Sequence, residues 1–444
     1  WLIANSHVAP SEALGLTFTK KAARELSSRI RSHLSTLVES GVGVECDEFE
    51  GPTVSTYNAF AAGLYRDNAI LLGRDPDASV LSEASAWALT RRVVASSLHP
   101  GLETCGLDPA AVTNRVRNLS QRLAENPVTS HDLEEFLAQL EKLRDLPPGG
   151  RGTYPGVGRA LDKVALLPLL ADLVAEVSEA KRLRGVLEFS DQIAFGLEII
   201  HRHPSVSSDL RTRYKVVLLD EYQDTSVAQT TLLSEIFGTH PVMAVGDPHQ
   251  AIYAWRGASS ANLVDFDTAF GPEVSSATLS TSWRNGVAVL DAANRVAEPL
   301  RDLPGPKAEI LTPREGAEFL APAVAFPTTL EEEASQVAAW FAHKLDSQGP
   351  GKPPSAAVIL RARAHQKRFV DALLEAGVPV HVLGIGGLLE DPAIADVVCA
   401  LRILAHPHAE TELVRLLTGA RWRLGVADIH ALAQTARWLV TRDE

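Results

Sequence analysis

Two adjacent acids follow a short apolar run near the middle of the chain. Residues 216–219 read Val-Val-Leu-Leu, and Asp220 and Glu221 come directly after them. A short apolar run that is rich in β-branched residues is typical of a buried parallel strand, and open α/β sheets bind ligands at the carboxyl ends of such strands. The first acid can hold a Mg²⁺ ion that bridges nucleotide phosphates. The second can orient and deprotonate a water molecule.

A second group of reactive side chains lies in the loop after the next predicted strand. Residues 241–245 predict that strand, and residues 246–258 read GDPHQAIYAWRGA, with a glycine near each end. The polar, aromatic and cationic side chains between the glycines are Gln250, Tyr253, Trp255 and Arg256. Aromatic rings and cations together bind single-stranded nucleic acid, the rings by stacking and the cations by charge. The alternative is a loop whose aromatic rings turn back into the core.

Two earlier segments predict further parallel strands that position these groups. Residues 13–18 predict a strand, after which Thr19 can cap a helix. Lys20 and Lys21 fall in the first turn of that helix, where the helix dipole disfavours cations. They indicate an anionic partner or are simply solvated. Residues 53–57 predict another strand, which runs into a second helix.

The rest of the chain divides by its pattern. Its 444 residues predict two to four domains. Residues 82–181 are helical in pattern, without strand signals, and predict a helical domain inserted into the sheet domain. Alternating strands and helices resume after residue 278, with strands expected at 356–360 and 378–383. The sequence therefore predicts an α/β protein with two sheet domains and helical insertions.

Composition excludes several classes of protein. Net charge is −13, from 42 Lys and Arg against 55 Asp and Glu, which argues against a generally DNA-binding surface but allows a local basic groove. The three cysteines lie far apart without a Cys-x-x-Cys pair, so a disulfide framework and a cysteine zinc site are both disfavoured. No apolar run is long enough to cross a bilayer. We expect a cytoplasmic protein without a membrane partner.

Taken in chain order, six segments resemble the motifs of the UvrD/Rep/PcrA-type DNA helicases of superfamily one. They read LTFTKKAA (residues 16–23), VSTYNAF (54–60), DEYQDT (220–225), VGDPHQAIYAWRGA (245–258), SWRN (282–285) and AVILRAR through GVPVHVLG (357–384). The family usually has His where Asn58 stands and Tyr where Trp283 stands. The inserted helical stretch and residues 187–192 are most similar to the actinobacterial AdnB helicase–nuclease subunit.

The resemblance implies a fold and an activity. The fold is α/β, with two RecA-like P-loop-type parallel-sheet domains and helical insertion domains. The first RecA-like domain would comprise residues 1–80 and 187–273, around an inserted helical domain at 81–186. Residues 274–405 would form part of the second, and 406–444 would begin a second helical insertion. The implied activity is ATP-driven 3′→5′ translocation on single-stranded DNA and unwinding of duplex DNA, in repair or recombination.

The resemblance also assigns roles to single residues. Asp220 would hold Mg²⁺, Glu221 would be the catalytic base and Gln250 would sense the γ-phosphate of ATP. Trp283 would stack on the adenine, and Arg284 would be an arginine finger from the second α/β domain. Without the motif, Trp283 reads as an ordinary core aromatic. The DNA-binding side chains that the resemblance implies are Phe18, Thr19, Lys20, Thr56, Asn58, Tyr253, Trp255 and Arg256.

The phosphate-binding loop and the last two family motifs, which would lie beyond Glu444, are missing from the sequence. No Gly-x-x-x-x-Gly-Lys-Ser/Thr occurs, and Gly351-Lys352 is followed by Pro353 without the required glycine spacing. The family's phosphate-binding loop lies just upstream of the position of Trp1, and the chain begins with Trp1 rather than Met. We therefore interpret the chain as an internal fragment that is inactive by itself.

Two other functions remain open at this point. The chain could be a non-motor DNA-binding or scaffold subunit of a helicase–nuclease complex, paired with a second subunit. Retention of Glu221, Gln250 and Arg284 argues against that, because a scaffold does not need them. The chain could also be an ATPase that acts on protein or RNA. Tyr253, Trp255 and the Phe18 strand end favour a single-stranded nucleic acid.

Overall fold

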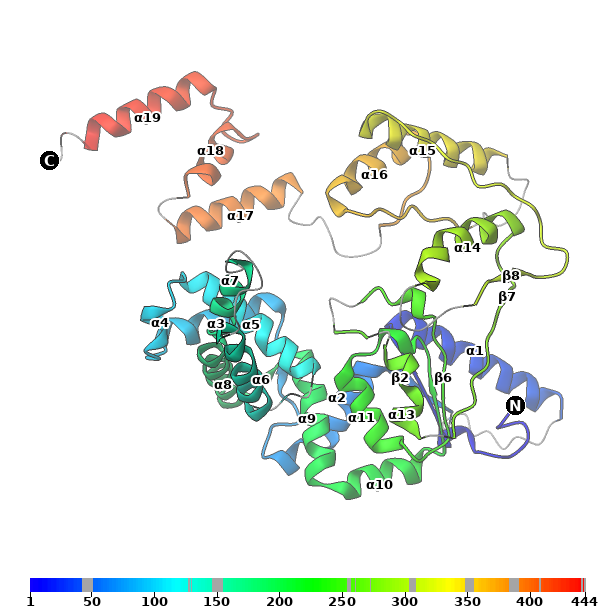
Figure 1. Ribbon diagram of the computed structural model, residues 1–444. Coiled ribbons are helices and arrows are strands. Elements are labelled where there is room, and N and C mark those ends of the chain that lie inside the picture. Colours follow the sequence, from blue (N-terminus) through cyan, green and yellow to red (C-terminus); the bar gives the residue numbers. More distant parts are fainter. Residues whose placement is uncertain are drawn as a thin grey trace. The chain divides into compact units, whose positions relative to one another are not determined.

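The computed structural model describes residues 1–41, 51–126, 128, 130–145, 155–253, 257–259, 261–271, 273–302, 309–347, 355–382, 391–406, 409–440 and 442. The chain forms two compact units, Trp1–Pro322 and Ala323–Glu444 (Figure 1). Within the described residues, no helix is both long enough and apolar enough to cross a membrane.

The first unit is built on a four-stranded parallel sheet. Its strands lie in the order β2 (Thr53–Thr56), β1 (Ala13–Thr17), β5 (Val216–Leu219) and β6 (Val242–Ala244). Residues 216–219 are a central strand, as the sequence predicts, and the other three strands also lie where they are predicted. In the register of the sheet, Leu219 faces Leu16 on one side and Ala244 on the other. The carboxyl ends of the strands therefore meet at one edge.

Helices cover the two faces of this sheet unequally. One face packs Leu14, Leu16 and Leu219 into the main core, together with α2 (Tyr57–Asn68), α9 (Phe189–Arg202) and α11 (Val227–Phe237). Strand residues alternate between faces, so Gly15 points to the other side, where it lies near Leu26 of α1 (Lys20–Glu39). On that second face Leu218, the register partner of Gly15, is 38% exposed.

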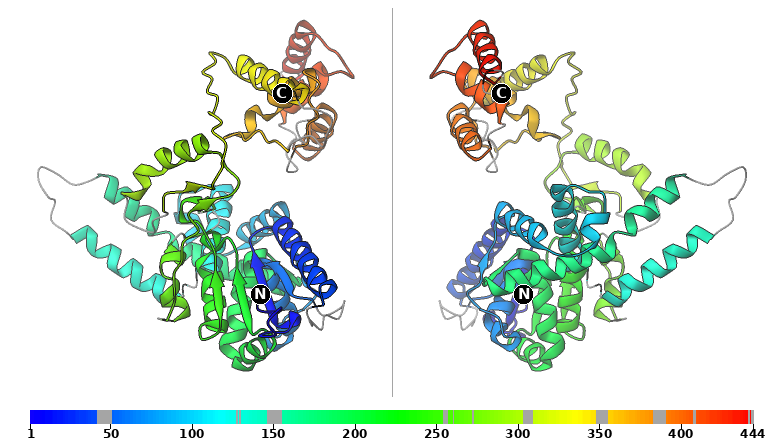
Figure 2. Two further views of the ribbon diagram at one scale, coloured as in Figure 1. Left: turned by 90° about the vertical axis from the view of Figure 1, so that its right-hand side faces the viewer. Right: turned by 90° about the vertical axis from the view of Figure 1, so that its left-hand side faces the viewer.

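A helical insertion leaves and rejoins the sheet domain at a pair of short parallel strands, β3 (Ser79–Val80) and β4 (Val186–Leu187). The described residues between them form α3 (Glu83–Ser96), α4 (Gly101–Thr104), α5 (Pro109–Glu125), α6 (Ser130–Glu141), α7 (Pro155–Val164) and α8 (Leu167–Leu183). The insertion has a small core of its own that includes Val112, Val116 and Leu173. Figure 2 shows its teal helices, α6 and α7, side by side.

A buried ion pair ties the insertion to the sheet domain. Lys181 on α8 is 5% exposed and donates hydrogen bonds to Asp191 on α9, the shorter at 2.6 Å. The remaining elements of the first unit are α10 (Pro204–Arg213), α12 (Ala261–Val264), α13 (Phe266–Phe270), α14 (Val287–Arg301) and a parallel pair of β7 (Thr281–Ser282) and β8 (Thr312–Pro313). Short 3₁₀ helices span Pro10–Glu12, Ala69–Leu72, Lys142–Asp145, Tyr222–Asp224, Pro248–Gln250 and, in the second unit, Arg363–His365.

The second unit is helical in its described residues. It contains α15 (Leu330–Asp346), α16 (Gln366–Glu375), α17 (Pro392–Ala405), α18 (Glu410–Thr418) and α19 (Val426–Val440). The strands expected at 356–360 and 378–383 are wrong as far as the unit is described, because residues 355–382 contain no strand. A strand needs a neighbour for its backbone groups. None is present within the described part of this unit, and Ile359 is 92% exposed.

Candidate active site

Asp220 lies where three chain segments converge at the carboxyl edge of the sheet. Thr17, the last residue of β1, donates a hydrogen bond from its hydroxyl to Asp220 Oδ2 at 3.1 Å. The Tyr57 hydroxyl donates to the Asp220 backbone carbonyl at 2.8 Å. Burial raises the pKa of Tyr57 well above its ordinary value, and the neighbouring Tyr222, Asp220, Glu221 and Asp224 add to the rise. Tyr57 is therefore a neutral donor that fixes the backbone of Asp220.

Glu221 has a strained backbone. Its φ is 51°, in the left-handed region that residues with a side chain rarely adopt. The neighbouring Tyr222 is fully buried and holds this turn, since its N–H donates to the Val245 carbonyl at 3.0 Å. Its ring packs edge-on against Phe266, with centroids 5.5 Å apart. Strain of this kind persists only where the surroundings impose it, and it clusters at functional sites.

Gln223 connects Glu221 to the loop after β6. Its side chain is completely buried, and its Nε2 donates to Glu221 Oε2 at 2.7 Å. Its Oε1 accepts from the Asp247 backbone N–H at 3.1 Å. Asp247 Oδ2 in turn accepts from Gln250 Nε2 at 2.8 Å. A continuous chain of hydrogen bonds thus runs from the predicted base to the predicted phosphate sensor.

Gly246 allows the backbone after β6 to lie close to Gln223. A Cβ atom added to Gly246 would lie 2.5 Å from Gln223 Oε1 and 3.3 Å from the Gln223 backbone nitrogen. Real Cβ atoms do not approach so closely, and the Gln223 amide is held at both ends by its hydrogen bonds. The glycine therefore lets the chain after β6 pass directly against Gln223.

Asp224 links the same turn to Ile252 and Tyr253, in the loop after β6. Burial raises the pKa of its carboxyl group, the charge of Glu221 adds to the rise, and hydrogen bonds from the backbone N–H groups of Ile252 and Tyr253 partly offset it. Tyr253 packs against Phe18, which follows β1, with ring centroids 4.5 Å apart and planes inclined by 36°. The sequence predicted both rings separately for DNA, and the fold brings them together at the same edge of the sheet.

Comparison with known proteins identifies the family. The model of the UvrD/REP helicase N-terminal domain matches residues 1–271. The chain belongs to the UvrD/REP helicase family. It is 25% identical over 437 residues to ATP-dependent DNA helicase PcrA of Bacillus subtilis. The match covers 98% of this chain and 52% of that protein.

Two mycobacterial relatives give similar results. The chain is 26% identical to ATP-dependent DNA helicase UvrD1 of Mycobacterium tuberculosis, over 96% of this chain and 50% of the relative. It is 27% identical to ATP-dependent DNA helicase UvrD2 of the same organism, and the match covers 96% of this chain and 56% of that relative. The chain therefore spans about half the length of the curated relatives that it matches. The resemblance to UvrD/Rep/PcrA-type helicases that the motifs indicate is confirmed at the level of the family.

Three of the other predicted DNA contacts of this UvrD/REP family chain, Thr19, Thr56 and Asn58, have structural partners of their own. The hydroxyl oxygen of Thr19 caps α1 by accepting from Ala22 N–H, and that of Thr56 caps α2 by accepting from Ala59 N–H, each at 3.1 Å. Asn58 Oδ1 accepts from Gln229 Nε2 at 2.8 Å, whereas Lys20 is exposed. Trp255 and Arg256 lie outside the described residues.

The predicted adenine platform and arginine finger follow β7. Trp283 is 78% exposed, so within the described part of the chain it is not a core aromatic. Arg284 is also exposed, and the adjacent turn is closed by a hydrogen bond between Ser282 Oγ and Asn285 Oδ1 at 3.1 Å. Among the described residues, no ion pair joins Arg284 to Asp220 or Glu221.

The oxygen donors at the strand ends suit Mg²⁺. The ion prefers oxygen ligands and keeps several waters, so one or two protein groups can hold it beside a nucleotide. Asp220 is half-buried and has the Thr17 hydroxyl next to its carboxylate. No cluster of three or more His, Cys, Asp or Glu that could form a complete protein cage occurs in the described residues. This arrangement fits an ion that is shared with phosphates.

Sequence reasoning missed three members of this site, namely Thr17, Gln223 and Asp247. Gln223 and Asp247 stand inside the motifs that the sequence singles out. Their positions between the recognised acids and Gln250 were a usable signal. Thr17 gave none, because its contact with Asp220 depends on the pairing of β1 with β5.

Proposed function

We propose that this chain contributes the ATP-hydrolysing and strand-gripping core of a DNA helicase that translocates 3′→5′ on single strands in DNA repair or recombination. The observation that supports it best is one shared edge of the sheet. The hydrogen-bond chain from Glu221 to Gln250 ends close in sequence to Tyr253, which packs on Phe18. The predicted base, Glu221, is therefore connected to the two stacking rings through hydrogen bonds and a short stretch of backbone.

In this proposal the residues act in sequence. Asp220 would hold Mg²⁺, which would supply positive charge to the phosphates of ATP. Glu221 orients the attacking water and accepts its proton. Gln250 contacts the γ-phosphate and moves when that phosphate leaves. Asp247 and Gln223 transmit the movement, because their hydrogen bonds connect Gln250 to the turn after β5.

Two predicted residues would complete the site from the segment after β7. We propose that Trp283 stacks on adenine, since its flat and exposed ring suits that role. Arg284 would stabilise transition-state charge when the segment closes over the nucleotide. We further propose the domain limits given by the sequence, with residues 1–80 and 187–273 as the first RecA-like domain, and a cytoplasmic location.

The test uses Glu221→Gln in the full-length protein. The amide keeps the shape of the side chain and loses the base, so ATP turnover is expected to fall by about 10²–10⁴-fold while nucleotide binding persists. Unwinding of duplexes with a 3′ or a 5′ single-stranded tail reads out direction, and the 3′-tailed substrate is expected to be the one unwound. Near-normal hydrolysis by Glu221→Gln would contradict the proposal.

The second candidate is a non-motor DNA-binding subunit that acts with a second, helicase–nuclease subunit. The same experiment separates the two functions. If the full-length wild-type protein binds DNA but shows no DNA-stimulated ATP hydrolysis without a partner, the scaffold function is supported and the motor is not.

A further inference from the structure

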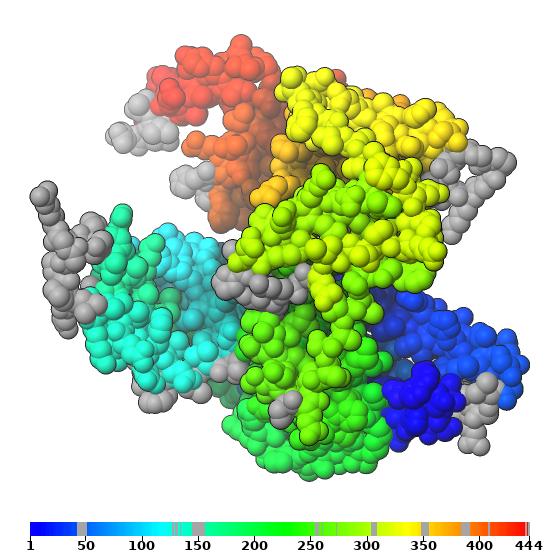
Figure 3. Space-filling model, turned by 45° about the vertical axis from the view of Figure 1, so that its right-hand side comes forward, coloured from blue at the N-terminus to red at the C-terminus, as the bar shows by residue number. Residues whose placement is uncertain are grey.

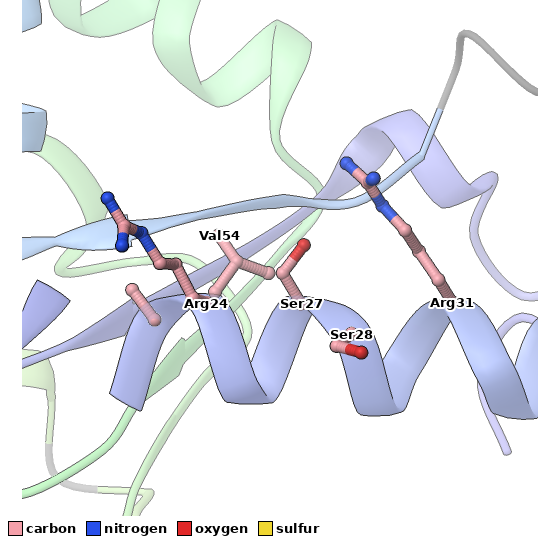
Figure 4. A pocket seen from close by; sticks show the side chains of 6 residues that line it. Arg24, Ser27, Ser28, Arg31 and Val54 are labelled. Carbon is pink, nitrogen blue, oxygen red and sulfur yellow. The ribbon is translucent and has the colours of Figure 1, made fainter. Parts of the chain in front are cut away.

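Helix α1 has a basic stripe, which we define as Lys20, Arg24 and Arg31 together with Ser27. These positions follow the spacing i, i+4, i+7 and i+11, which places them on one face of a helix. Figure 4 shows the Arg24 and Arg31 side chains extending from α1 toward the same side, with Ser27 between them. From Lys20 to Arg31 the stripe is roughly 16 Å long, at 1.5 Å per residue.

The charge of α1 differs from that of the chain as a whole. The helix reads KKAARELSSRIRSHLSTLVE, which contains five Lys or Arg against two Glu. The whole chain has 42 Lys or Arg against 55 Asp or Glu, which gives a net charge of −13. Lys20 also stands in the first helical turn, where the dipole of α1 opposes a cation. An anionic partner would offset this unfavourable placement.

The stripe does not contribute to the core. The buried residues of α1 are Ala23 and Leu34, on a neighbouring face, whereas Lys20, Arg24 and Arg31 are exposed. Among the described residues, no carboxylate lies within 4.0 Å of these three cations. Figure 3 shows α1, in blue, at the surface of the first unit. The three charges are therefore available to a partner outside this part of the chain.

Three members of the stripe, Arg24, Ser27 and Arg31, also line a hollow between α1 and the edge strand β2. It has a volume of about 430 Å³, and its lining includes Arg24, Ser27, Ser28, Arg31 and Val54. Guanidinium groups bind phosphate oxygens through parallel N–H donors, and serine hydroxyls are frequent additional donors to phosphates. The hollow thus combines the two kinds of group that recognise a phosphodiester.

We propose that the basic stripe binds the sugar–phosphate backbone of the same DNA strand whose bases stack on Phe18 and Tyr253. The inference rests on the proposed function and extends its DNA path beyond the strand ends. Lys20 follows Phe18 by only two residues, so the stripe begins at the stacking rings and leads away from them.

The experiment compares Arg31→Gln with Arg29→Gln in the full-length protein. Both residues are exposed on α1, and each substitution removes one charge, but Arg29 lies on the opposite face from the stripe. Glutamine is a good helix former, so both variants are expected to fold. The dissociation constant of a fluorescent oligothymidylate is measured at several salt concentrations, with a long oligomer and with one too short to extend past Phe18 and Tyr253.

For the long oligomer, Arg31→Gln is expected to reduce the slope of log K against log [salt] by about 0.7 in magnitude, the value for one lost contact with a single strand. Arg29→Gln should leave the slope unchanged, and neither variant should affect the short oligomer. Equal slopes in both variants and wild type would overturn the proposed contact between the stripe and DNA, while leaving the proposed DNA-binding function intact. A wild-type protein that binds neither oligomer would overturn the proposed function itself.

Discussion

Gln223 Nε2 lies 2.7 Å from Glu221 Oε2 and donates a hydrogen bond to it. The amide that makes this contact is completely buried and is held at its other end by the Asp247 N–H. Gln223 thus positions the side chain of Glu221, the predicted base. While its amide makes these two contacts, it cannot also contact a nucleotide. We predict that Gln223 acts as a positioning residue for Glu221.

Gln223→Ala in the full-length protein is expected to lower kcat for ATP hydrolysis by about 10²-fold, the order of loss for a misplaced catalytic group. KM for ATP should change little, because Gln223 does not belong to the predicted phosphate or adenine contacts. Gln223→Glu should lose as much activity, since a carboxylate cannot donate to Glu221. Gln192→Ala, at another buried amide, is the matched control and should keep kcat. An unchanged kcat in folded Gln223→Ala would refute the positioning role.

Gly246→Ala is expected to disturb the same contact from the other side. The added methyl group would meet Gln223 Oε1 at 2.5 Å, so the amide must move and its bond to Glu221 must lengthen. Hydrolysis should fall while the protein remains folded, which circular dichroism can confirm. Gly63→Ala is the control, because no atom lies within 4 Å of the new Cβ and the helix gains about 0.4–1 kcal/mol from reduced unfolded-state entropy. Equal activity in the two variants would contradict the argument.

The packed pair of Phe18 and Tyr253 should behave as one stacking unit for DNA. Tyr253→Ala is expected to weaken binding of single-stranded DNA by about 1–3 kcal/mol, with oligothymidylate and oligoadenylate affected alike. Tyr253→Phe keeps the ring and should keep the affinity. Because the two centroids are 4.5 Å apart, a double-mutant cycle with Phe18→Ala should show clear coupling. Strictly additive losses would mean that the rings act independently.

Two buried tyrosines predict how stability depends on alkaline pH. Burial raises the pKa of Tyr222 to about 12 and that of Tyr57 well above 10.0. Their contribution is fully present below the unfolded pKa near 10 and is lost as pH rises through the folded values, because only the unfolded state then releases protons. The free energy of unfolding should therefore decline between about pH 10 and 12, measured by denaturant titration. Tyr222→Phe should make this decline shallower, and an identical slope would argue against a buried neutral Tyr222.

Sequence reasoning was most reliable where one segment carried its own signal. Residues 216–219 are apolar on both sides of the strand and end in two acids, so their place in the centre of a parallel sheet could be predicted. Helix caps such as Thr19 were equally local, and the Thr19 hydroxyl accepts from Ala22 as expected. Contacts between segments were not predictable in the same way. The bond from Thr17 to Asp220 spans 203 positions and depends on strand register.

The strands expected at 356–360 and 378–383 failed for a related reason. Apolar runs of this length favour a strand only when neighbouring strands can pair with them, and the described part of the second unit provides none. Val378 packs instead with Ala338 and Leu373 against α15 and α16. The pattern identified residues that need burial, but it could not supply the partner that decides their backbone conformation.

The pairing of β3 with β4 has a consequence for how this chain can vary. Val80 faces Leu187 directly, so the chain is already back beside its point of departure when the insertion ends. The closure entropy of such a detour grows slowly, by about 0.6 kcal/mol for each doubling of its length. The length of the intervening segment can therefore change while the register of the four-stranded sheet, and with it the spacing of Thr17, Asp220 and Asp247, stays the same.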